Sequence, residues 1–79
     1  MKLTYDPTCD VAYLELQDKP VQVRTIEVTE DLNVDIAPDG SVYGIEFLDA
    51  NRQLGTDRHG KLVIVNESSG QSTEVALPV

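Results

Sequence analysis

The segment from Asp31 to Asp35 reads Asp-Leu-Asn-Val-Asp, the spacing of oxygen-bearing side chains with which an EF-hand calcium loop begins. Such a loop needs glycine at its sixth position and a bidentate glutamate at its twelfth, and these positions hold Ile36 and Val42. The apolar residues within the segment instead continue a period-two alternation. We therefore interpret the segment as one solvated face of a β-strand.

A second route to chemistry is the convergence of Asp31, Asp35 and Glu46 on one face of a hairpin. If residues 37–40 form a four-residue loop, Asp31 lies directly across from Glu46. Like charges in that arrangement destabilise a sheet unless a divalent cation, a basic partner residue or an outward splay relieves them. A small metal-dependent or carboxylate-based enzyme is therefore the rival hypothesis for function.

The other reactive groups predict no reaction. Cys9 lies at a turn before a strand, where a cysteine typically behaves as a small apolar residue. His59, the only histidine, lies in a polar turn. Pairs of carboxylates arise by chance in a chain with 14 acidic residues. No motif commits the chain to catalysis. We therefore expect a binding protein rather than an enzyme, and no cofactor is implied.

Length and composition favour association. A core built from 79 residues supplies about 3–5 kcal/mol, so small folds often add a disulfide, a metal or a partner subunit. One cysteine cannot form an intrachain disulfide, and one histidine with it cannot build a Cys/His zinc site. A homodimer or a complex with another protein is the stabilising device that remains.

Charge narrows the class of partner. Fourteen acidic and six basic residues give a net charge of −8. Nucleic acids and anionic membranes require clustered Lys and Arg, which are scattered here, so direct binding to either is disfavoured. A basic partner protein or simple solubility fits better. No segment approaches the roughly 20 apolar residues of a membrane span, and the lone cysteine predicts a reducing cytoplasm.

Apolar residues alternate with period two along most of the chain, which predicts a mainly β fold, with α+β as the alternative. Turn signals at Asp6-Pro7, Glu30-Asp31 and residues 37–40 divide the pattern into strands. We expect an antiparallel sheet of about six strands with at most one short helix. That helix is predicted over Ala50 to Leu54, with Asp49 as N-cap and Gly55 at its end. Residues 62–65 and 73–79 predict a final hairpin.

Two motifs carry a resemblance to a known family. From Tyr5 the chain reads Tyr-Asp, three residues, Asp, two residues, Tyr and an apolar strand. From Gly40 it reads Gly-x-Val-x-Gly-Ile-Glu-x-Leu-Asp-Ala. Together they resemble the small prokaryotic family catalogued as domain of unknown function 2283, over Lys2 to Ala50. Residues 1–79 are then one domain, with a family-like β core over 1–50 and an extra turn and hairpin over 51–79.

The resemblance implies a β-rich fold, an unassigned activity and a set of candidate binding residues. Some members are encoded beside small toxin-like proteins, which implies a partner-neutralising role by association. Gly44, in mid-strand, predicts a bulge or a close backbone approach. The candidate binding residues are Tyr5, Asp6, Asp10, Tyr13, Glu46 and Asp49.

Physical roles follow for these residues. Tyr5 and Tyr13 are predicted to form an aromatic cluster or to anchor an interface. Asp6 and Asp10 are predicted to cap the turn between the first two strands. Glu46 is the polar residue that we most expect to act in binding. The leading hypothesis is a protein-binding module, self-associating or neutralising a partner, with a purely structural homodimer as a further alternative.

Overall fold

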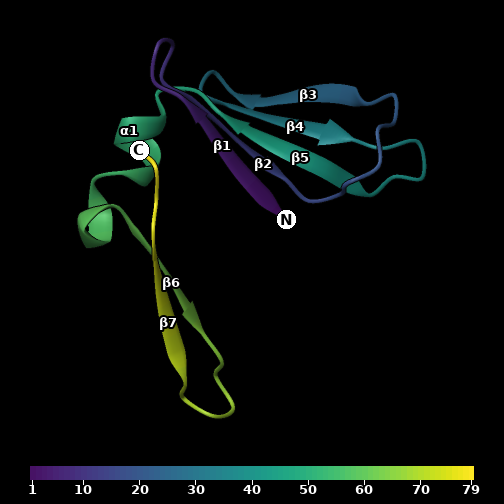
Figure 1. Cartoon of the computed structure of the whole chain (residues 1–79). Helices are drawn as coiled ribbons and strands as arrows, with labels where there is room; N and C mark the ends of the chain where they lie inside the picture. Colours follow the sequence, from purple (N-terminus) through teal and green to yellow (C-terminus); the bar gives the residue numbers. More distant parts are fainter.

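The structure, a computed structural model, describes residues 1–79 and contains seven antiparallel strands in two separate sheets, one short helix and a 3-10 turn (Figure 1). The prediction of a mainly β fold is confirmed, with seven strands where about six were expected. No helix is long and apolar enough to cross a membrane. The elements are β1 (Lys2–Asp6), β2 (Val11–Glu15), β3 (Arg24–Thr29), β4 (Leu32–Ile36), β5 (Val42–Phe47), α1 (Ala50–Leu54), η1 (Asp57–Gly60), β6 (Lys61–Val65) and β7 (Ser72–Ala76).

The larger sheet has five strands in the order β1-β2-β5-β4-β3. Tight turns join β1 to β2, β3 to β4 and β4 to β5, and all three were predicted from their turn residues. The connection from β2 to β3, residues 16–23, crosses from the interior of the sheet to its far edge. Strands that are distant in sequence, β2 and β5, therefore become neighbours at the centre of the sheet.

The register of the β4–β5 hairpin differs from the expected one by two residues. Asn33, and not Asp31, is the partner of Glu46. The cause is a bulge between Asp35 and Ile36, where β5 carries one extra residue, together with a loop that extends to Ser41. The Asp31–Glu46 opposition that motivated a cation site is therefore absent.

One straight row of apolar side chains runs across all five strands. Direct register partners define it, in the order Leu3, Leu14, Ile45, Val34 and Ile26. We call the side of the sheet that carries this row the apolar face. Because successive residues point to opposite sides of a strand, the intervening positions form a polar face.

No second layer covers the row from Leu3 to Ile26, although Ala12, on the same face near α1, is fully buried. The only buried residues in the chain are small: Ala12, Ala37, Ala50 and a glycine, Gly44. No large side chain is fully buried, and Ile26 at the edge of the row is 39% exposed. Domains normally bury a sheet's apolar face against another layer, and this sheet has no such layer packed on the row.

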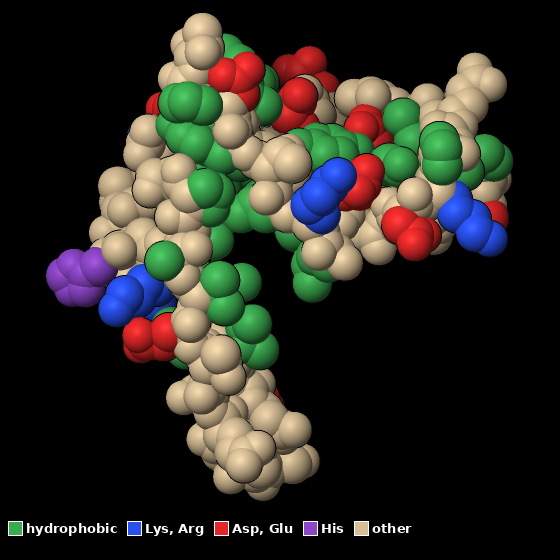
Figure 2. Space-filling model, viewed as in Figure 1, with side chains coloured by type: hydrophobic (Ala, Val, Ile, Leu, Met, Phe, Trp, Pro, Cys, Tyr) green, Lys and Arg blue, Asp and Glu red, His purple; other side chains and the backbone are tan.

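The β6–β7 hairpin extends away from the larger sheet (Figure 1). Its base lies at η1 and the end of α1, where the Leu77 amide donates to the Gly60 carbonyl at 2.9 Å. The chain consequently has a radius of gyration of 13.9 Å, against about 11.6 Å for a compact domain of this length. Hydrophobic side chains gather in the angle between hairpin and sheet (Figure 2).

Candidate functional site

The six predicted binding residues separate into two groups. Tyr5, Asp6, Asp10 and Asp49 lie at the end of the sheet that meets α1, whereas Tyr13 and Glu46 lie on the polar face. The predicted aromatic cluster is wrong. Tyr5 pairs with Ala12, the residue before Tyr13, so the two tyrosines project from opposite faces of the sheet.

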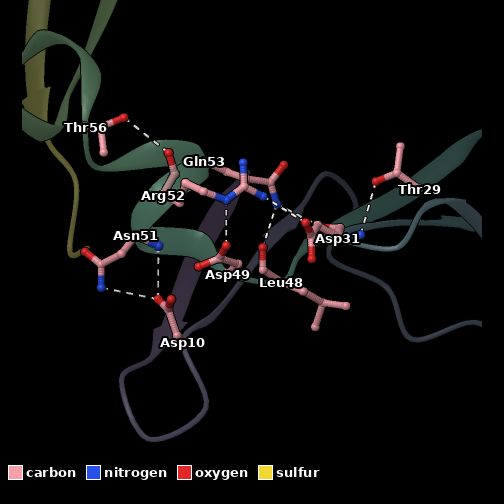
Figure 3. A network of polar contacts seen from close by, with 9 residues as sticks. All are labelled: Asp10, Thr29, Asp31, Leu48, Asp49, Asn51, Arg52, Gln53 and Thr56. Carbon is pink, nitrogen blue, oxygen red and sulfur yellow. Dashed lines mark hydrogen bonds and ion pairs between the residues drawn. The ribbon is translucent and has the colours of Figure 1, made fainter.

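Asp10 joins the β1–β2 turn to the start of α1, through an arrangement that we call the joint (Figure 3). Its Oδ1 accepts hydrogen bonds from the Tyr5 hydroxyl at 2.9 Å and from the Asn51 amide at 3.0 Å. The Asn51 side-chain amide also donates to Tyr5 Oη at 3.0 Å. The hydrogen bond from the Tyr5 hydroxyl to Asp10 is the main cause that raises the pKa of Tyr5. Asp10 adopts the left-handed conformation, with φ at 56°.

The predicted limits of α1 and the N-cap position of Asp49 are confirmed, but the side chain of Asp49 does not cap the helix. Asp49 makes no capping hydrogen bond and has a φ of 51°. Asp10, from another turn, accepts from the Asn51 amide in its place. Asp10 therefore does not cap its own turn as expected, whereas Asp6 does, because its Oδ1 accepts from the Thr8 amide at 2.9 Å. That backbone hydrogen bond lowers the pKa of Asp6.

Arg52 ties α1 to the turn between β3 and β4, a contact that the sequence did not suggest (Figure 3). Its guanidinium donates to Asp49 at 2.6 Å and to Asp31 at 2.8 Å. Gln53 reinforces the same link, because its side-chain amide donates to the backbone carbonyls of Asp31 and Leu48. Asp49, which the family motif marked, thus serves as an ion-pair partner within the chain.

Tyr13 reaches across the polar face of the sheet. Its hydroxyl donates to Asp35 Oδ2 on β4 at 2.8 Å, and the Thr25 hydroxyl on β3 donates to the other oxygen of Asp35 at 2.6 Å. Gly44 lies beneath the ring, and a Cβ there would clash with Tyr13 Oη. The prediction of a close approach at Gly44 is confirmed. Burial, together with the Asp35 hydrogen bond, raises the pKa of Tyr13.

The three carboxylates of the rival enzyme hypothesis have different partners. Asp31 binds Arg52, Asp35 binds Tyr13, and Glu46 accepts from the Asn33 side-chain amide at 2.9 Å. No group of three His, Cys, Asp or Glu side chains is placed to hold a metal ion. Each carboxylate therefore stabilises the sheet locally.

Cys9 and His59 also stand apart from any reactive arrangement. Cys9 is exposed in the β1–β2 turn, where desolvation and the neighbouring Asp6 raise the pKa of its thiol. A raised pKa lowers the fraction of thiolate, the nucleophilic form. His59 is exposed in η1. The depressions on the surface are open and shallow, and none of the six candidate residues lines them.

The surface that sequence reasoning missed is the apolar face itself. The signal was present, because period-two alternation predicts one apolar side for each strand. Whether this face is covered depends on the path of the last third of the chain, which the alternation does not predict. The polar networks hold the sheet and its joint together and leave the row from Leu3 to Ile26 without a covering layer.

The fold and its surfaces define a class: a small antiparallel sheet with one uncovered apolar face, joined through α1 to an extended hairpin. Residues 2–51 match the family model described as "Protein of unknown function (DUF2283)", so the chain belongs to that family. The match covers the five-stranded sheet and ends at Asn51, the residue that Asp10 binds. No curated protein and no solved structure shows significant similarity to the chain.

Proposed function

We propose that this chain is a protein-binding module whose binding surface is the apolar face of the five-stranded sheet. One observation carries the proposal: the row from Leu3 to Ile26 spans every strand, yet no side chain larger than alanine is buried anywhere in the chain. Exposed contiguous apolar surface of this kind marks sites where another macromolecule binds.

Protein is the class of partner that fits best. A sheet face without an enclosed cavity offers little to a small molecule, which needs a concave site to bury most of its surface. The net charge of −8 opposes nucleic acid and anionic lipid. The exposed thiol of Cys9 is in keeping with a reducing cytoplasm.

The neutralisation of a basic, toxin-like protein remains within this proposal. Acidic residues such as Glu27 and Glu46 on the polar face would attract a basic partner. That Tyr13 and Glu46 anchor such a partner stays a prediction, while their hydrogen bonds within the sheet support a structural role. The apolar face is the better supported surface, because no second layer of the chain covers the row from Leu3 to Ile26.

Methyl NMR with a soluble gadolinium chelate tests the proposal, because the chelate relaxes methyl groups that water reaches. Isotope-labelled chain is measured alone over a range of concentrations and in an extract of its native cells. We expect the methyls of Val34 and Ile45 to be shielded in at least one condition, while Val11 on the polar face stays accessible. Full relaxation of Val34 and Ile45 in every condition would contradict the proposal.

Variants on the two edge strands supply the matched control. Ile26→Lys places a charge on the apolar face, and Thr4→Lys adds the same charge to the polar face at the opposite edge. We expect only Ile26→Lys to abolish shielding of the apolar face, with both variants keeping the circular dichroism of the parent chain.

A further inference from the structure

We propose that the occupant of the apolar face is the β6–β7 hairpin of a second copy of this chain, in a two-fold symmetric dimer that exchanges hairpins. This inference rests on the proposed function and names the partner. Each copy would then offer both halves of the interface, the sheet face and the hairpin.

The surface area of the chain agrees with a missing partner. The isolated chain exposes 5787 Å², against about 4,700 Å² for a compact monomer of the same mass. The excess, about 1,000 Å², is close to the roughly 800 Å² that each partner buries in a standard stable interface. The uncovered surface is thus about what one dimer contact removes.

The hairpin carries an apolar face of its own. Leu62 and Ile64 on β6 lie on one side with Val75 on β7, and each of the three is about half exposed. The charged pair Lys61 and Glu74 lies on the other side, with 3.4 Å between Lys61 Nζ and Glu74 Oε2. Binding through the apolar side would therefore desolvate no charge of the hairpin.

The length of the hairpin matches that of the sheet strands, and its loop is ordered. Strands of the hairpin and of the sheet contain five or six residues, about 17–20 Å, so a hairpin can cover the central strands along their length. Asn66 orders the hairpin loop, because its side-chain oxygen accepts from the Ser68 and Ser69 amides. A loop that is already ordered loses little conformational entropy on docking.

A second copy is favoured over folding back onto the same sheet. Val79 lies against Gly55, and the Leu77 amide binds the Gly60 carbonyl, so both ends of the hairpin are held beside α1. From this base the hairpin extends away from its own sheet (Figure 1). Reaching that sheet would break these contacts, whereas a two-fold operation presents the sheet of another copy and closes the assembly.

Two hairpin variants with opposite orientation test the inference in the full-length chain. Ile64 and Val65 are neighbours on β6, 52% and 53% exposed, and face opposite sides. We expect a dimer by sedimentation equilibrium for the parent chain and for Val65→Lys. Ile64→Lys should raise the dimer dissociation constant at least about 100-fold, because symmetry counts each substitution twice.

Intermolecular contacts supply a readout that needs no substitution and stands even if a variant fails to fold. In a mixture of labelled and unlabelled parent chains, isotope-filtered NOEs should join the Ile64 methyls of one copy to Val34 or Ile45 of the other. If these NOEs arise only within one chain, or if none exists between hairpin and sheet, the exchange is wrong.

The variants separate failure of this inference from failure of the proposed function. A dimer that Ile26→Lys breaks but Ile64→Lys leaves intact would mean that two sheets pair directly, which overturns the hairpin as occupant and keeps the sheet as a binding surface. A parent chain that stays monomeric at millimolar concentration would overturn the exchange. In that case shielding of Val34 in cell extract would still support a foreign partner.

Discussion

The five-stranded sheet and the β6–β7 hairpin use the same antiparallel pairing and similar strand lengths, but side chains support them very differently. On the sheet, Tyr13 and Asp35 bridge three strands across Gly44, and the joint at Asp10 fixes the position of α1. On the hairpin, the one polar side-chain contact between strands is an exposed ion pair. Such pairs contribute about 0–1 kcal/mol.

The sheet is stabilised by contacts within the chain, whereas the hairpin depends on a partner for stabilisation. Satisfied polar networks make the sheet a defined unit, whereas an isolated two-stranded hairpin is marginal in water. Both regions nevertheless expose an apolar face. The simplest physical reading is that each region supplies the layer that the other lacks, in a second copy of the chain.

The largest loss of stability should come from Gly44→Ala, which disrupts the side-chain network that supports the sheet. The new Cβ would occupy the place of the Tyr13 hydroxyl, so the ring must move and lose its bond to Asp35. We expect a loss of about 2–4 kcal/mol in unfolding free energy, measured by urea denaturation. In a Tyr13→Ala background the same substitution should cost much less, and equal costs in both backgrounds would contradict the close-approach account.

Substitution of Asp10 should rank next, because it removes the acceptor that joins the β1–β2 turn to α1. Asp10→Ala should lose about 2 kcal/mol, from the missing cap of α1 and from the left-handed backbone that alanine disfavours. Asp10→Asn keeps an acceptor oxygen and tolerates that backbone, so it should lose less. An alanine variant as stable as the parent would show that the joint is dispensable.

Tyr13→Phe should cost about 1 kcal/mol at neutral pH and change the pH dependence of stability. Burial and the hydrogen bond to Asp35 raise the pKa of Tyr13 above the ordinary 10.0, so the folded chain favours the neutral phenol. This contribution is complete below pH 10 and is lost as the pH rises further. Urea melts between pH 8 and 11 should show a steeper alkaline loss for the parent than for the variant; parallel curves would count against the hydrogen bond.

Added salt should produce the smallest effect, a change in the dimer dissociation constant. The direction of that change distinguishes a second copy of the chain from a basic partner. Two copies with a net charge of −8 repel each other, so added salt should strengthen the dimer by a few-fold as screening increases. A complex with a basic partner should weaken under the same conditions. Sedimentation equilibrium at 0.05 and 0.5 M salt measures the effect, and a dimer that dissociates as salt rises would contradict an apolar interface between like-charged copies.

Local patterns in the sequence predicted most elements of the fold. Alternating apolar residues and the turn at residues 37–40 identify the central hairpin, and residues 50–54 form the expected helix. The register of that hairpin was not predictable in the same way, because Gly44 indicated a bulge or a close approach but not the extra residue that β5 carries opposite Asp35 and Ile36. One misplaced register then moved Asp31 to the wrong partner.

The joint depended on contacts that no local pattern contains. Asp10 and Asn51 are 41 residues apart, and only the folded sheet brings the β1–β2 turn to α1. Arg52 likewise reaches Asp31 across 21 residues. The motif residues make hydrogen bonds or ion pairs within the chain, and the uncovered surface depends on where the hairpin points.

Amide hydrogen exchange at two protein concentrations, one below and one above the range of dimer formation, tests the central claim most directly. Sheet amides such as that of Ile45 should be protected at both concentrations. Hairpin amides such as that of Ile64 should gain protection only at the higher one, because their cover comes from a second copy. Hairpin protection that is the same at both concentrations would contradict the exchange of hairpins between two chains.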